Sequence, residues 1–183
     1  MFSLKVNKDI ELALAMPFMA KEIFTLVMAN KEHIGEWMVW VEKTKEPLDT
    51  QKFIEYALKG LAKGEMLACT IYYQGKIAGL IDLHSIRKSH KKASIGYWLD
   101  SSLQGKGIMS KSLQALCAFA FEKLELNKLI ILCDKENIKS QNVAKRAGFQ
   151  EEGLLQQEMR VNGEFRDFYR YALLKEEFED VKA

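Results

Sequence analysis

The chain has 183 residues, of which 48% are hydrophobic and 28% charged, and its formal net charge is +2. This composition excludes a disordered chain, and the near-neutral charge argues against a strongly basic nucleic-acid binder. The length and the lack of a Ser- or Gly-rich linker predict one domain over residues 1–183. The first ten residues (MFSLKVNKDI) lack the continuous apolar stretch of a signal peptide, and no run approaches about 18 apolar residues, so we expect a cytoplasmic protein without membrane contact.

The cysteine pattern argues against a metal or redox site. Cys69, Cys117 and Cys133 lie far apart in apolar runs, and no CxxC pair occurs. Their odd number and wide spacing predict reduced core residues rather than zinc ligands or a disulfide pair. We therefore expect no metal cofactor.

Hydrophobic periodicity and turn residues predict alternating helices and strands along the chain. The first half is expected to contain a strand over 10–15, a helix over 18–30 beginning near Pro17, a short helix over 33–40, a helix over 51–62 capped by Asp49 or Thr50, and strands over 66–73, 76–85 and 93–99. The second half is expected to contain a helix over 108–124, a strand over 128–133, a helix over 138–147, and a hairpin around Asn162-Gly163. This order predicts an α/β (α+β) fold, a mixed sheet flanked by helices.

A glycine-rich turn carries the clearest chemical signal. Residues 104–107 (QGKG) separate the strand over 93–99 from the long helix. The first N–H groups of a helix lack internal partners, and the helix dipole adds partial positive charge there. Glycines allow close approach of an anion to those groups, so the turn predicts a phosphate-binding cradle. The alternative is a glycine turn that binds no ligand.

Two familiar nucleotide motifs almost match this turn. Both GxGxxG and GxxxxGK[ST] need a glycine at position 110, where the sequence has Ser110. The turn also follows about 100 residues of other elements rather than a first parallel strand. An NTPase is therefore a weaker interpretation, although LIILCD at 129–134 imitates the strand-ending aspartate of such proteins.

The turn resembles the Q/R-x-x-G-x-G/A signature of the GNAT N-acetyltransferases, whose loop binds the pyrophosphate of acetyl-CoA. Residues 137–149 (NIKSQNVAKRAGF) resemble that superfamily's second conserved segment, and IGYWLD at 95–100 with QGKGIMS at 104–110 resembles its RimL-like branch of ribosomal-protein-serine acetyltransferases. The resemblance implies a mostly antiparallel sheet that splays between the strands over 93–99 and 128–133. Met109 departs from the final Gly/Ala of the signature, but that position can still donate its backbone N–H.

The resemblance also implies which residues bind acetyl-CoA. Asn137 is similar to the side chain that contacts the pantetheine arm, and the strand over 93–99 to the one that pairs with it. The expected cofactor-binding residues are Tyr97, Trp98, Leu99, Gln104, Gly105, Lys106, Gly107, Ile108, Met109, Ser110, Asn137 and Ser140. Tyr97 is open to a second interpretation as a core residue, and the Lys106 side chain to one as a solvated charge.

The expected acid differs from the common family pattern. Many GNAT members have a tyrosine four residues before the glycine of the GF pair, where this chain has Ala144. Ser140 lies one turn earlier on the same helix face, so we expect its hydroxyl to protonate the leaving sulfur. The alternative is that Ser140 caps the N-terminus of its helix.

The sequence leaves open which residue acts as the general base. Asp82 and His84 lie two residues apart on one strand, hence on the same face, and either could accept the proton of an attacking ammonium group. The alternatives are a polar pair on a solvated sheet face and a water molecule as the proton acceptor.

Trp37 and Trp40 are expected to present one helix face to the acceptor, with simple packing as the alternative. The RimL-like resemblance implies transfer of acetyl to the N-terminal α-amine of a ribosomal protein, in a homodimer or higher homo-oligomer. No nucleic acid is expected as a direct partner. Two other functions stay open: acetylation of a small amine such as a polyamine or an aminoglycoside, and a silent acyl-CoA-binding module.

Overall fold

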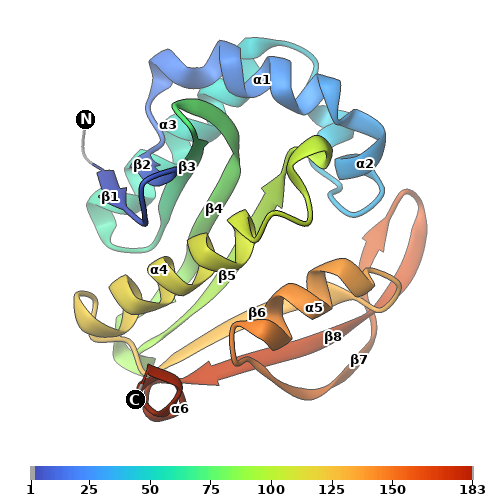
Figure 1. The fold of residues 1–183 in the computed structure, drawn as a ribbon. Helices are drawn as coiled ribbons and strands as arrows, with labels where there is room; N and C mark the ends of the chain where they lie inside the picture. The colour runs from blue at the N-terminus through green and yellow to red at the C-terminus, as the bar shows by residue number, and fades with distance from the viewer. Residues whose placement is uncertain (1–2, 183) are drawn as a thin grey trace.

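A computed structural model describes residues 3–182, without the side chains of 179–182. Its strands form one eight-stranded sheet in the order β1-β2-β3-β4-β5-β6-β8-β7 (Figure 1). The strands are β1 (Ser3–Lys5), β2 (Ile10–Leu14), β3 (Leu67–Tyr73), β4 (Lys76–Arg87), β5 (Lys92–Leu99), β6 (Lys128–Asp134), β7 (Gln150–Val161) and β8 (Glu164–Leu174). This confirms the predicted mixed sheet flanked by helices.

The sheet opens between β5 and β6. β5 and β6 form the one parallel pair of the described sheet, and they pair only from Lys92 to Ser94 and from Lys128 to Ile130. Every other neighbouring pair is antiparallel. Beyond Ser94 the two strands diverge, as the resemblance implied, and the gap exposes strand backbone next to the C-terminal half of β5.

Helices cover both faces of the sheet. They are α1 (Ala20–Ala29), α2 (Lys31–Gly35), α3 (Pro47–Lys63), α4 (Ile108–Glu122), α5 (Ile138–Arg146) and α6 (Lys175–Lys182). Buried residues of α1 and α3 pack with Ala68, Leu80 and Trp98 on one face. On the other face, α4 and α5 pack with alternate residues of β4, β5, β6 and β8. Figure 1 shows α4 lying over β5 and α5 over β6 and β8.

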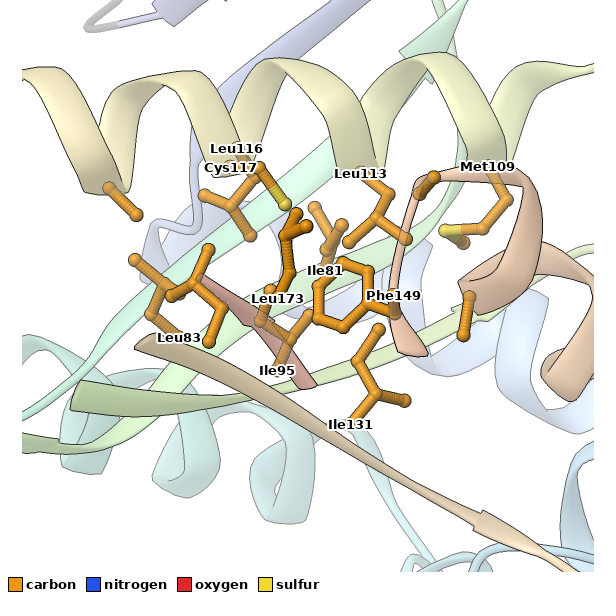
Figure 2. Packing of buried hydrophobic residues seen from close by; sticks show 14 of the residues in the cluster. Ile81, Leu83, Ile95, Met109, Leu113, Leu116, Cys117, Ile131, Phe149 and Leu173 are labelled. Atoms are coloured by element: carbon orange, nitrogen blue, oxygen red, sulfur yellow. The ribbon is translucent and has the colours of Figure 1, made fainter. Parts of the chain in front are cut away.

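The start of α4 is anchored by a dense apolar core. Figure 2 shows Leu113, Leu116 and Cys117 of α4 pointing toward the sheet, with the ring of Phe149 among them. All four side chains are at most 3% exposed. Because such a core is close-packed, the N-terminal end of α4 is held at a defined position over the gap between β5 and β6.

The two predicted hairpin turns are confirmed. Gln74 and Gly75 join β3 to β4 with φ values of 50° and 79°, and Asn162 and Gly163 join β7 to β8 with 50° and 88°. Left-handed angles at both central positions match the right-handed twist of the flanking strands, which is why Asn and Gly are favoured there.

Several boundaries differ from the predictions. The short helix ends at Gly35, and both Trp37 and Trp40 follow it in non-helical turns, so no single helix face presents both rings. α3 begins at Pro47 rather than 51, because Glu46 caps it and Asp49 closes the capping box from inside the helix. The strand β1 and the helix α6 were not predicted, since each is short or polar in sequence.

Candidate functional site

A cavity of about 960 Å³ lies between the C-terminal end of β5, the first turn of α4, α5, and the segment after α2. It brings together most of the expected cofactor-binding residues. Those that line it are Tyr97, Trp98, Leu99, Gln104, Gly105, Gly107, Ile108, Met109, Ser110, Asn137 and Ser140. Residues up to 43 positions apart in sequence therefore line one cavity of the size of a ligand site.

The turn into α4 has a run of free amides. Within residues 3–182, no protein atom accepts a hydrogen bond from the backbone N–H groups of residues 105–110. The first backbone bond after this run is donated by Lys111 to the carbonyl of Gly107. Unsatisfied amides at the N-terminus of a 15-residue helix form a site for an anion.

Gly105 and Gly107 shape this run. Their φ values are 76° and 72°, in the left-handed region that residues with a Cβ adopt only at a cost. An added Cβ would meet no atom within 4 Å at Gly105, and at Gly107 only the Lys111 side chain at 4.0 Å. The glycines are therefore needed for backbone angle and open approach, and not to avoid a protein neighbour.

Gln104 bridges the two sides of the cavity. Its Nε2 donates to Nε2 of His33 at 2.6 Å, and its Oε1 accepts from Nζ of Lys139 at 3.0 Å. His33 belongs to α2 and Lys139 to α5, so the signature glutamine joins two elements over 100 residues apart. It orders the entrance beside the free amides.

Ser140 lies at the centre of a small polar cluster. Its Oγ is 3.0 Å from the hydroxyl of Tyr97 and 3.3 Å from Sγ of Cys133, and the Tyr97 hydroxyl also donates to the Ser140 carbonyl at 3.1 Å. Burial raises the pKa of Tyr97 above its ordinary value, so this phenol stays protonated. With the tyrosine proton directed to the carbonyl, the Ser140 hydroxyl keeps its own proton to donate.

Asn137, not Ser140, caps α5. The Oδ1 of Asn137 accepts from the backbone N–H of Ser140 at 3.1 Å, so the capping interpretation of Ser140 is wrong. The capping bond uses only the oxygen of the amide. Within the part of the chain that the structure describes, no protein atom accepts a hydrogen bond from Nδ2 of Asn137, so both of its hydrogens are available to a carbonyl acceptor in the cavity that Asn137 lines.

Asp82 and His84 lie outside the cavity wall. Nδ1 of His84 is 2.6 Å from Oδ1 of Asp82, and both side chains lie on the sheet face that carries α1 and α3. Asp82 pairs with Gly96, two residues beyond the point where β5 and β6 stop pairing. The pair therefore borders the gap in the sheet from the face opposite α4.

Two expected binding residues, Trp40 and Lys106, lie outside the cavity wall. Trp37 lines the cavity, but Trp40 does not; its ring lies 6.5 Å from that of Trp98, centroid to centroid. Lys106 does not line the cavity either, because its Nζ lies 5.9 Å above the Tyr73 ring. Its contribution to the turn is its backbone N–H.

Apart from Trp37, sequence reasoning missed the residues of α2 and of the segment after it that line the cavity. They are His33, Glu36 and Met38. No motif marks these residues, and their helical periodicity ends at Gly35. Only their packing against distant elements brings them to the site.

Cys133 provides a test of the environment around Ser140. Burial raises the pKa of its thiol to about 11. The raised pKa means that the folded state favours the neutral thiol. The contribution of Cys133 to the free energy of unfolding is therefore fully present below the unfolded pKa of about 8.5, and it is lost as the pH rises through about 11. Because the thiolate is the reactive form, we expect iodoacetamide at pH 8 to alkylate Cys133 on the order of 100-fold more slowly in the folded protein than in urea.

Mass mapping of the alkylated peptides measures this rate. Cys69, whose pKa burial raises to about 12, serves as an internal comparison that should react only at still higher pH. Rapid labelling of Cys133 in the folded protein at pH 8 would contradict the buried position beside Ser140.

Known proteins are similar to this chain in sequence and in fold. Residues 17–150 match the acetyltransferase (GNAT) domain family. The ribosomal-protein-serine acetyltransferase of Escherichia coli K12 is 32% identical, over 93% of this chain and 95% of its own. The solved structure of RimL, a ribosomal L7/L12 α-N-protein acetyltransferase in complex with coenzyme A, superposes with a TM-score of 0.92 at 31% identity, covering 94% of this chain and 98% of that one.

A microcin C7 self-immunity acetyltransferase, MccE, solved with acetyl-CoA and AMP, has a TM-score of 0.89 at 31% identity, covering 93% of this chain and 95% of that one. The chain belongs to the GNAT acetyltransferase family, in which it groups with RimL-like proteins. It is an N-acetyltransferase, and acetyl-CoA is its co-substrate.

Two further observations bear on the expected partners. No helix among residues 3–182 combines the length and the apolar character that crossing a membrane requires. In the same part of the chain, no cluster of three or more His, Cys, Asp or Glu side chains is arranged to hold a metal ion.

Proposed function

We propose that this enzyme transfers acetyl from acetyl-CoA to the N-terminal α-amine of a protein, with a serine-initiated ribosomal protein as acceptor. The free amides of residues 105–110, at the mouth of a cavity that also contains Ser140, carry the proposal. The names of its relatives support the acceptor, since the Escherichia coli protein is a ribosomal-protein-serine acetyltransferase. The proposal includes action in the cytoplasm, as one domain over residues 1–183 and as a homo-oligomer.

The residues of the cavity fit the co-substrate. The amides of residues 105–110 would bind its diphosphate, and Nδ2 of Asn137 would donate to its pantetheine arm. Acetyl-CoA supplies the acetyl group as a thioester, which an amine attacks directly. An α-amine has a pKa near 7.7–8.0, so about a tenth or more is neutral at pH 7 and needs no strong base.

Proton transfer completes the proposed chemistry. As the amine attacks the carbonyl, the bond from carbon to sulfur breaks and the sulfur takes a proton. The Ser140 hydroxyl is placed to give this proton, and a thiol with a pKa near 8.5 needs only weak assistance. Most of the rate enhancement comes from positioning of the two reactants.

The acceptor is tested by mass spectrometry of intact products. Acetyl-CoA is incubated with a serine-initiated peptide, with the same peptide already blocked at its N-terminus, and with spermidine. We expect one acetyl group on the free peptide only, with equal release of free thiol. Acetylation of spermidine alone would overturn the protein acceptor, and coenzyme A binding without thiol release from any amine would indicate a silent binding module.

We also propose that His84 accepts the proton of the ammonium group through Nε2, with Asp82 holding its Nδ1–H. We expect His84→Ala to lower kcat/KM about tenfold, a modest effect because part of the amine is already neutral, and to change the acidic limb of the pH–rate profile to the one that the amine itself sets. Asp82→Asn should also shift the acidic limb.

His90→Ala is the matched control, since His90 lies in the exposed turn before β5 and should leave the profile unchanged. Identical profiles for His84→Ala, Asp82→Asn and the parent protein would leave water as the proton acceptor.

A further inference from the structure

The hairpin of β7 and β8 reaches across the molecule to the segment after α2. Nδ2 of Asn162 donates to the carbonyl of Gly35 at 3.2 Å, and Nη1 of Arg166 donates to the carbonyl of Glu36 at 3.3 Å. The Arg166 guanidinium also lies 6.0 Å from the centroid of the Trp37 ring. These contacts join residues about 130 positions apart. They hold residues 36–38, named here the cavity loop, which form one wall of the site.

Arg166 makes a second contact, with the last residue of β6. Its Nη1 lies 3.2 Å from Oδ2 of Asp134, whose side chain is only 2% exposed. The other oxygen, Oδ1, accepts from the backbone N–H of Glu136 at 2.8 Å and so shapes the turn that leads to Asn137. Glu136 and Asn137 line the cavity, on the wall to which the proposed function assigns coenzyme A.

One carboxylate therefore connects both walls. A buried charge needs a partner, so Asp134 holds the Arg166 guanidinium in place. The planar guanidinium has several donors in a fixed arrangement and a flat face, so it can bind a carboxylate, a carbonyl and an aromatic ring together. A lysine ammonium is a compact point charge and lacks that geometry.

We propose that Arg166 is a positioning residue for the amine acceptor. Its bonds to Asp134 and to the cavity loop set the distance between the acceptor wall and the cofactor wall of the site. The inference rests on the proposed function, in which the amine enters between these walls. Arg166 acts through the backbone of Glu36 and the ring of Trp37 and does not itself contact the reacting atoms.

The first test compares Arg166→Met with Arg160→Met. Arg160 lies on the same hairpin and also stacks on a ring, with its Cζ 6.0 Å from the Phe165 centroid, but within residues 3–182 it contacts neither the cavity loop nor Asp134. We expect Arg166→Met to raise KM for the acceptor peptide about tenfold while kcat and the Kd for acetyl-CoA change less than about twofold. Arg160→Met should change none of these quantities.

Hydrogen exchange of the free protein provides a readout that needs no acetyl transfer. We expect faster exchange of the amides of residues 36–38 in Arg166→Met and no change there in Arg160→Met. If exchange is faster in Arg166→Met but the parent protein does not acetylate the peptide, the positioning role is supported and the proposed acceptor is overturned. Unchanged exchange, or an unchanged KM in an active enzyme, would overturn the positioning role.

Two more variants separate positioning from folding. Arg166→Lys keeps a positive charge beside Asp134, so it should stay folded and still raise KM. The double variant D134N/R166M removes the buried Asp134 charge together with the Arg166 charge, and it replaces Arg166→Met in the comparison if that variant is unstable. If both variants bind the acceptor as the parent does, the inference is wrong.

Discussion

Replacing Gly107 with valine weakens binding of coenzyme A by about 10- to 100-fold. At a φ of 72° a β-branched residue is strained by about 1–2 kcal/mol, and the peptide relieves that strain by rotating. The rotation turns amides of residues 105–110 away from the diphosphate. Each charge-assisted hydrogen bond lost costs about 1–3 kcal/mol, and each 1.4 kcal/mol is about tenfold in Kd. Isothermal titration calorimetry measures the effect.

The control for this prediction is Gly75→Val. Gly75 has a φ of 79° and no atom within 4 Å of an added Cβ, but it lies in the turn between β3 and β4. Both variants should lose similar thermal stability, while only Gly107→Val loses affinity for coenzyme A. Equal affinities in the two variants would show that the turn into α4 does not bind the diphosphate.

The second large effect is expected from Ser140→Ala, which should lower kcat about 100-fold. This is the lower end of the range for a general acid, because a thiol leaving group with a pKa near 8.5 needs little assistance. The affinity for acetyl-CoA should change little, since the variant keeps the amide run and the capping bond from the Ser140 N–H to Asn137. Single-turnover thiol release gives the rate of the chemical step.

Tyr97→Phe is the companion variant. It removes the hydroxyl 3.0 Å from Ser140 Oγ but leaves the serine in place. We expect a smaller loss in kcat than for Ser140→Ala, because Tyr97 orients the serine and is not itself the proton donor. Parent-like turnover in Ser140→Ala would falsify the acid role, and a larger loss in Tyr97→Phe than in Ser140→Ala would assign the proton to the tyrosine.

Most elements of the fold were predictable because their signals are local. The apolar residues of α4 recur at helical spacing, and Gln74-Gly75 and Asn162-Gly163 favour left-handed turns whatever surrounds them. The prediction of a helix over 33–40 was wrong because a long-range contact, and not a local signal, sets the conformation there. The helix ends at Gly35, and Trp40 packs against Trp98 of β5. No residue pattern near position 35 predicts that long-range contact.

The candidate site also has a part that local motifs predict and a part that they do not. The turn at residues 104–107 and the segment beginning at Asn137 are contiguous motifs. The residue types of the turn indicated an anion site, and the resemblance to the GNAT family implied that this anion is the diphosphate and that Asn137 contacts the pantetheine arm. Lys106 shows the limit of this reasoning, because its charge suggested phosphate binding while its side chain lies over Tyr73. Backbone roles were easier to predict than side-chain directions.

The order of residues was enough to predict the class of enzyme, because the motifs that resemble the GNAT family are contiguous in sequence. Glycine angles and helix-terminal amides depend on a few neighbouring residues, and by themselves they predicted only an anion site. The far wall of the cavity depended on folding. His33, Glu36 and Trp37 reach the site through Gln104 and Arg166, over separations of 71 to 130 residues. Such contacts have no local signal because they form only when packing of the sheet and its helices brings distant backbone segments within hydrogen-bond range.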